Sequence, residues 1–433
     1  MTGTFLAVTA LLFLLLVNGA PVAFAMLATG ILGIWLVGGT FPVIGVLASA
    51  PYETVAAYTL STLPMFILMG EFLTSGRFTR DIFNASYKWL GHLRGGLGYA
   101  AISGGVMLAA VTGSSTAAAS TLASAAYPEM KRYGYKDSFS TASLAVVGTL
   151  AILIPPSVTL IIYGILTETS VGALLMAGII PGILTAAGFV AAIKVSVSRN
   201  PELAPVAPER STLSERMLSL RTVWPVVLLM VAMLAGIYSG AITVTEVGAV
   251  GATLAFVIAL TMRRLTRESA LQAIVRTARS SAMILTIIAC ASVFGIFITL
   301  TRVPQGLLEY VQASGLNRWV VLAIIMVALL ILGFFLDQLA ILVLTLPIIF
   351  PVLQGLEFNA VWLGVLVIKT VEIGLVTPPM GLNCFVVSSV TGVPVHRVFS
   401  GLFVFLVFDV TMLAILIAFP ELTLFLPRLA GYN

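Results

Sequence analysis

The segment Gly113-Ser114-Ser115-Thr116 places a helix breaker and three hydroxyl groups inside a long apolar stretch. A helix that breaks within a membrane leaves backbone N–H and carbonyl groups without partners. Carbonyl and hydroxyl oxygens at such a break suit a small cation such as Na⁺. The alternative is close helix packing through small residues. The segment therefore predicts either the tip of an ion-binding hairpin or a packing motif.

A second break follows in the other half of the chain, in the segment 333–337, Gly-Phe-Phe-Leu-Asp. A carboxylate such as that of Asp337 costs about 2.5–3.5 kcal/mol at the centre of a membrane helix, and such residues are functional in most cases. Asp337 is therefore expected to bind the ion or carry a proton. The alternative is that it caps the helix that follows.

Two Pro-Pro pairs break two further apolar stretches, in ILIPPS around Pro155 and in VTPPMG around Pro378. Each break frees carbonyl groups, and each half-helix N-terminus favours an anion. We expect Na⁺ to be held mainly by backbone oxygens around the four breaks. The predicted Na⁺-binding residues are Ser114, Ser115, Ala151, Ile154, Pro156, Gly333, Gly374, Thr377 and Met380.

Polar residues beside these breaks are candidates for substrate binding. Lys369 and Glu372 are three residues apart, so they lie on one helix face. Lys369 could receive a substrate carboxylate, or the two residues could form a structural ion pair. The candidate substrate-binding residues are Thr116, Ser157, Lys369, Gly381 and Asn383.

The composition predicts an all-α polytopic membrane protein. Of the 433 residues, 60% are hydrophobic and 9% are charged, and the mean hydropathy is +1.12. A soluble domain carries about 25% charged residues. The alternating pattern of a membrane β-barrel is absent. The net charge of +5 reflects basic loops and does not indicate a nucleic-acid partner.

The breaks recur in the same order, which predicts an inverted-topology repeat with one re-entrant hairpin and about five spans in each half. The first repeat is 1–197, with its third span at about 54–73, a hairpin at about 96–126 and a broken span at 138–167. A cytoplasmic linker is expected at 198–221. The second repeat is 222–433, with a hairpin at about 319–356 and a broken span at 360–390. Transporters of this design bind substrate near the midplane, between broken helices.

The distribution of basic residues predicts the topology. With the N-terminus outside, eighteen of the 22 Lys and Arg residues lie in cytoplasmic segments, three lie outside and Lys369 lies within a span. Such a bias is typical of cytoplasmic loops. We therefore expect the first hairpin to open to the cytoplasm and the second to the outside.

Two other classes of protein fit poorly. An intramembrane serine hydrolase built on Ser114 would need a base. The chain has only His92 and His396, both in or near segments expected at the cytoplasmic surface. There is no Walker A motif, which argues against an ATP-driven pump. A secondary transporter, which is not an enzyme and needs no cofactor besides a coupling ion, is favoured.

Taken together, TGSSTAAAST, LAILIPPS and VTPPMGLNCFVVSSVTG resemble the large membrane subunit of tripartite ATP-independent periplasmic (TRAP) transporters, the DctM type. The similarity covers essentially the whole chain. One departure is Ala151, where the family often has glycine, although alanine still offers its carbonyl.

The resemblance implies a multi-pass protein of the bacterial inner membrane with a periplasmic N-terminus. Its partners would be a small four-span membrane subunit, a periplasmic substrate-binding protein and membrane lipid. Na⁺ would drive uptake of organic acids, such as C4-dicarboxylates or sugar acids, by an elevator motion. The alternative is a stand-alone Na⁺- or H⁺-coupled carrier of the same ion transporter superfamily.

Overall fold

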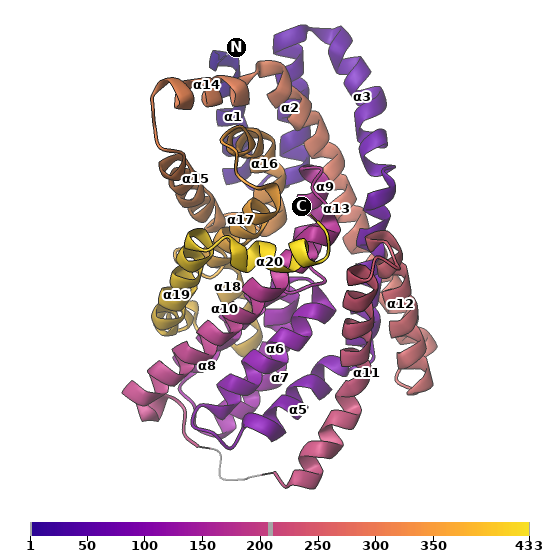
Figure 1. The fold of residues 1–433 in the computed structure, drawn as a ribbon, viewed down its shortest axis with the longest axis vertical. Coiled ribbons are helices and arrows are strands. Elements are labelled where there is room, and N and C mark those ends of the chain that lie inside the picture. The colour runs from indigo at the N-terminus through magenta and orange to yellow at the C-terminus, as the bar shows by residue number, and fades with distance from the viewer. Residues whose placement is uncertain (1, 207–210, 433) are drawn as a thin grey trace.

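The computed structural model describes residues 2–206 and 211–432, and the described residues form helices and no strands (Figure 1). This confirms the predicted all-α polytopic fold. The helices of the first half are α1 (Thr2–Val17), α2 (Val22–Gly38), α3 (Thr40–Val55), η1 (Tyr58–Ser61), α4 (Thr62–Ser75), α5 (Phe78–Leu90), α6 (Gly96–Thr112), α7 (Ser115–Arg132), α8 (Asp137–Thr149), η2 (Leu150–Ile152), α9 (Val158–Leu166) and α10 (Val171–Arg199).

The second half has a comparable order of helices. They are η3 (Pro201–Leu203), α11 (Leu213–Tyr238), α12 (Val244–Thr261), α13 (Arg267–Thr301), α14 (Val303–Ala313), α15 (Arg318–Gly333), α16 (Gln338–Gly355), α17 (Ala360–Gly374), α18 (Leu382–Thr391), α19 (Val395–Ala418) and α20 (Glu421–Leu429). A helix pair, a broken helix and a long helix follow one another in α6–α10 and again in α15–α19. In Figure 1, α6 and α7 lie toward the lower end of the molecule, and α15 and α16 lie toward the upper end.

Five of the described helices, α10, α11, α13, α16 and α19, are each long and apolar enough to cross a membrane. A sixth span is possible where α3 is followed, after a bend of 50°, by η1 and α4. The structure shows a helix from Thr40 onward, so the predicted third span, 54–73, leaves out residues 40–53. Pro51 and Glu53 lower the hydropathy of that helix, and none of its residues is buried, so its sequence does not resemble a membrane core.

The predicted linker 198–221 is shorter in the structure. Helix α10 runs through Arg199, and α11 begins at Leu213, so residues 213–221 are helical. The cause is a capping box. The Thr212 hydroxyl accepts from the Glu215 N–H, and the Glu215 carboxylate accepts from the Thr212 N–H. Residues 207–210 lie outside the described part of the chain.

Two buried helices, α8 and α17, lead into the Pro-Pro breaks. Every residue of α8 from Phe139 onward is buried, as is every residue of α17 from Trp362 onward. Helix α8 packs against α7, α18 and α19, and α17 packs against α10 and α15. The first break, 153–157, is buried, whereas Pro378, Pro379 and Met380 of the second break are exposed.

Candidate functional site

The tip of the first helix pair lies against the first Pro-Pro break. Gly113 ends α6 in a left-handed conformation with φ of 57°, and Ser114 is extended and precedes α7. A Cβ atom at Gly113 would lie 3.4 Å from the Pro156 carbonyl oxygen and 3.2 Å from Val158. A residue with a side chain would be strained here and would crowd the break. The glycine therefore allows two predicted Na⁺-binding segments to approach each other.

The first break is buried and internally hydrogen-bonded. Ser157 caps α9, since its hydroxyl accepts from the Leu160 N–H at 3.2 Å and donates to the Ile152 carbonyl at 2.5 Å. Ala151, Ile154 and Pro156 are buried beside it. Ser157, a candidate for substrate binding, thus stabilises the conformation of the break through these two hydrogen bonds.

The second break lies against the end of α15. The backbones of Gly333 and Gly374 touch, because a Cβ atom at Gly374 would lie 2.7 Å from the Gly333 Cα. The Thr377 hydroxyl donates to the Ile373 carbonyl at 2.6 Å. Gly381 precedes α18 with φ of 53°. Gly333 therefore lies against Gly374, which is three residues before Thr377, whereas the Met380 side chain is half exposed.

Asp337 caps α16. Its Oδ1 accepts from the Leu339 N–H at 2.8 Å and from the Ala340 N–H at 3.0 Å, and its side chain is exposed. This arrangement matches the capping alternative for Asp337.

The cap leads to a testable prediction. Asp337→Ala should destabilise the helix pair by about 0.5–2 kcal/mol through loss of the cap. Asp337→Asn should keep both the cap and uptake, because an amide oxygen accepts the same bonds. Thermal unfolding and uptake are measured on both variants. If the Asn variant folds normally but cannot transport, the carboxylate charge itself has a role with the ion.

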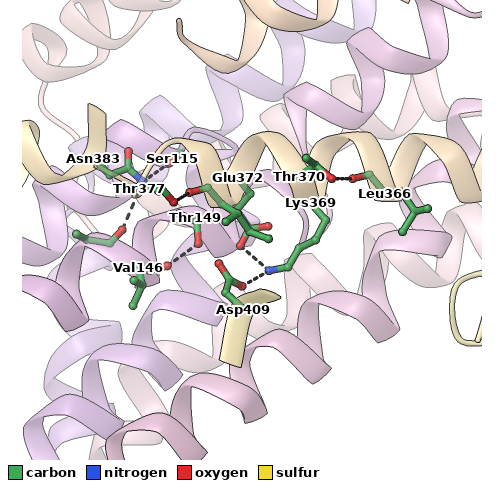
Figure 2. Close-up of polar contacts among 12 residues, drawn as sticks. Ser115, Val146, Thr149, Leu366, Lys369, Thr370, Glu372, Thr377, Asn383 and Asp409 are labelled. Atoms are coloured by element: carbon green, nitrogen blue, oxygen red, sulfur yellow. Dashed lines mark hydrogen bonds and ion pairs between the residues drawn. The ribbon is translucent and has the colours of Figure 1, made fainter. Parts of the chain in front are cut away.

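One side chain joins the two halves of the chain. Asn383, on α18, donates from Nδ2 to the Ser115 hydroxyl at 2.6 Å and to the Ala145 carbonyl at 3.4 Å (Figure 2). Ser115 and Asn383 are both buried. No partner is present for Asn383 Oδ1 among the described residues. The predicted Na⁺-binding residue Ser115 and the candidate substrate residue Asn383 are thus in direct contact.

Both tips border a single cavity of about 250 Å³. The first tip contributes Gly113 and Ser114, and the second contributes Gln338 and Leu339. Helices α4 and α13 close the other side of the cavity. At one corner, the ion pair of Glu71 and Arg276, with N–O distance 2.7 Å, joins these two helices. The Gln338 Oε1 atom is buried without a partner among the described residues.

Thr116 lies beside the first tip, with 3.4 Å between its hydroxyl oxygen and that of Ser114. It does not line the cavity. The Ser114 residue therefore lines the cavity, whereas the Ser115 hydroxyl contacts α18.

A buried ion triad joins the C-terminal part of α17, ahead of the second break, to α19. The Lys369 ammonium contacts Glu372 at 3.0 Å and also contacts Asp409 of α19 (Figure 2). All three side chains are 0–1% exposed. An ammonium enclosed by two carboxylates leaves little room for a substrate carboxylate. The geometry therefore favours the structural ion pair over substrate binding by Lys369.

Sequence reasoning assigned Asp409 no function. A signal was present, because Asp409 lies within the apolar run VFDVTM, and a carboxylate inside a membrane helix requires a partner. Its partner is forty residues away, which no local pattern reveals.

Residues 9–422 match the family model described as "Tripartite ATP-independent periplasmic transporter, DctM component". A C4-dicarboxylate TRAP transporter large permease protein of Pseudomonas aeruginosa is 36% identical, over 89% of this chain and 90% of the relative. A sialic acid TRAP transporter large permease protein of Vibrio cholerae is 32% identical, over 97% of each chain.

Two further matches bear on assembly and fold. An isethionate TRAP transporter permease protein, DctMQ, of Oleidesulfovibrio alaskensis is 29% identical, and the match covers 89% of this chain but 60% of that protein. Among solved structures, the YdaH transporter of Alcanivorax borkumensis matches with a TM-score of 0.63 and 13% identity, over 89% of this chain and 90% of that one. This last likeness concerns the fold alone.

Proposed function

This chain belongs to the DctM family of TRAP transporter large permeases, and from that premise we propose that it is the large membrane subunit of a Na⁺-coupled importer of organic acids. Membership makes it a multi-pass membrane transporter subunit and not an enzyme. The finer points of the proposal are the coupling ion, the motion, the substrate, the partners and the orientation.

One observation carries the proposal of an ion-coupled site. The two hairpin tips border one cavity, and the Asn383–Ser115 hydrogen bond joins the halves beside it. Backbone carbonyls and hydroxyls at broken helices are the donor set that Na⁺ transporters use. We propose that Ser114, Ser115 and the carbonyls of the first break hold one Na⁺. Gly333, Gly374, Thr377 and Met380 hold a second, mainly through backbone oxygens.

We place the substrate in the 250 Å³ cavity between the tips and α4 and α13. This volume suits a small organic acid. The N-terminal ends of α7 and α16 at the tips would favour its carboxylate. The names of the relatives support the substrate class, since C4-dicarboxylates and sialic acid both carry carboxylates.

An elevator motion fits this arrangement. The hairpins and broken helices would move as one body past α4 and α13, and the cavity lies at that boundary. We further propose an inner-membrane location with the N-terminus in the periplasm, on the strength of the 18-to-3 bias of basic residues.

We propose two protein partners, a small four-span membrane subunit and a periplasmic substrate-binding protein. The relative named DctMQ supports the first, because this chain matches only 60% of its length. The unmatched 40% of that protein is long enough to contain a fused small membrane subunit.

The test is uptake into liposomes that contain the chain with both partners. Uptake should require an inward Na⁺ gradient and should stop when Na⁺ is replaced by K⁺ or choline. Equal uptake without Na⁺ would overturn the sodium proposal and favour H⁺. A control without the binding protein separates the alternatives, because a stand-alone carrier would still transport.

A further inference from the structure

Four arginines from two distant segments line one pocket of about 680 Å³. Arg77 and Arg80 come from the α4–α5 junction, and Arg263 and Arg264 come from the α12–α13 connection. The remaining lining residues are Ser75, Gly76, Asp81, Asn84, Thr266 and Ser269. This arginine pocket is separate from the cavity between the hairpin tips and shares no residue with it.

The pocket carries excess positive charge. Arg264 pairs with Asp81, but Arg77, Arg80 and Arg263 have no ion-pair partner among the described residues. By contrast, Arg276 and Arg397, on the same predicted face, pair with Glu71 and Asp137. These three guanidinium groups are exposed around one pocket, so they are accessible to an anion from outside.

The backbone holds two of these arginines in unusual conformations. Arg77 and Arg263 have φ of 59° and 54°, in the left-handed region that disfavours side chains. Glycine or asparagine would adopt this conformation more easily. Arg264 is fixed in turn by its stacking over Phe78, 4.6 Å from the ring centroid.

The pocket lies where lipid headgroups are expected. Amphipathic α5 begins at its edge, and such helices lie along the membrane surface. The helix leading up to Arg263, α12, exposes Val257 (45%) and Leu260 (52%). Acyl chains could pack on that apolar surface while a headgroup enters the pocket. Guanidinium groups bind phosphate oxygens through paired hydrogen bonds.

We propose that the arginine pocket binds the headgroup phosphate of an anionic phospholipid from the predicted cytoplasmic leaflet, with the acyl chains along α12. Basic pockets between membrane helices bind lipids of this kind. The proposal does not depend on Na⁺ coupling or on the identity of the transported acid.

The test uses delipidated full-length protein in detergent, with phosphatidylglycerol added and bound lipid counted by native mass spectrometry. Wild type should bind phosphatidylglycerol in preference to phosphatidylcholine. The variant Arg77→Gln/Arg80→Gln/Arg263→Gln should lose about fivefold in affinity for each arginine, roughly a hundredfold in all.

The control is Lys131→Gln/Arg199→Gln/Arg279→Gln, which removes the same charge from residues that do not line the pocket. It should bind phosphatidylglycerol like wild type, and equal losses in both variants would overturn the proposal in favour of non-specific attraction. Equal binding of phosphatidylcholine by wild type would also overturn it. Displacement of the lipid by millimolar inorganic phosphate would instead assign the pocket to a free anion.

If the triple variant fails to fold, as judged by thermal unfolding, the single variant Arg263→Gln replaces it. That variant should keep the wild-type melting temperature and lose about fivefold in lipid affinity. Unchanged affinity in a folded Arg263→Gln protein would count against the pocket.

Discussion

Replacing Lys369 by methionine should cost about 3–5 kcal/mol of stability, the usual cost of removing one partner from a buried ion pair. The substitution leaves the Glu372 and Asp409 carboxylates without their shared cation in a site where neither is more than 1% exposed. Thermal unfolding of the purified protein in detergent measures the loss.

The triad also predicts an order of stability among its variants. Glu372→Gln should cost less than Lys369→Met, because the Lys369–Asp409 pair remains. The triple variant Lys369→Met/Glu372→Gln/Asp409→Asn should recover part of the loss, since no buried charge is left. Lys131→Met, at an exposed cation, is the matched control and should melt like wild type. A Lys369→Met protein as stable as wild type would contradict the buried triad.

The substitution Gly374→Ala, which adds one methyl group, should weaken the Na⁺ dependence of uptake more than it lowers the stability of the protein. The new Cβ would lie 2.7 Å from the Gly333 Cα and 3.0 Å from its carbonyl carbon, so the two backbone segments must separate. Overpacking of this kind costs about 1–3 kcal/mol. If the cost falls on the Na⁺-bound state, Na⁺ affinity drops by about 5- to 150-fold. The Na⁺ concentration for half-maximal uptake measures this change.

Gly295→Ala is the matched control. Gly295 lies within the membrane helix α13 and has no atom within 4 Å of an added Cβ. Its alanine variant should show the wild-type Na⁺ dependence. If Gly374→Ala also leaves the Na⁺ dependence unchanged, the second ion site does not use the Gly333–Gly374 contact.

Several local features of the fold follow from short stretches of sequence. The apolar composition requires membrane helices, because lipid offers the backbone no hydrogen-bond partners. The breaks at Gly113 and at the Pro-Pro pairs appear where the sequence places them, since glycine and proline act on their own backbone. Residues 40–53 and 213–221 are helical but lie outside the predicted spans. Pro51 and Glu53 hide the first of these helices, and the capping box of Thr212 and Glu215 starts the second.

The sequence by itself therefore determined the class of protein, the four breaks and the residue types around them. Only the tertiary structure decided which residues meet. Asn383 contacts Ser115 across 268 residues, Gly333 lies against Gly374, and Lys369 takes Asp409 as a second partner. The physical reason is that such contacts depend on how whole helices pack. A helix breaker acts within one turn of the chain, whereas a buried amide or carboxylate takes its partner from whichever helix packing brings beside it.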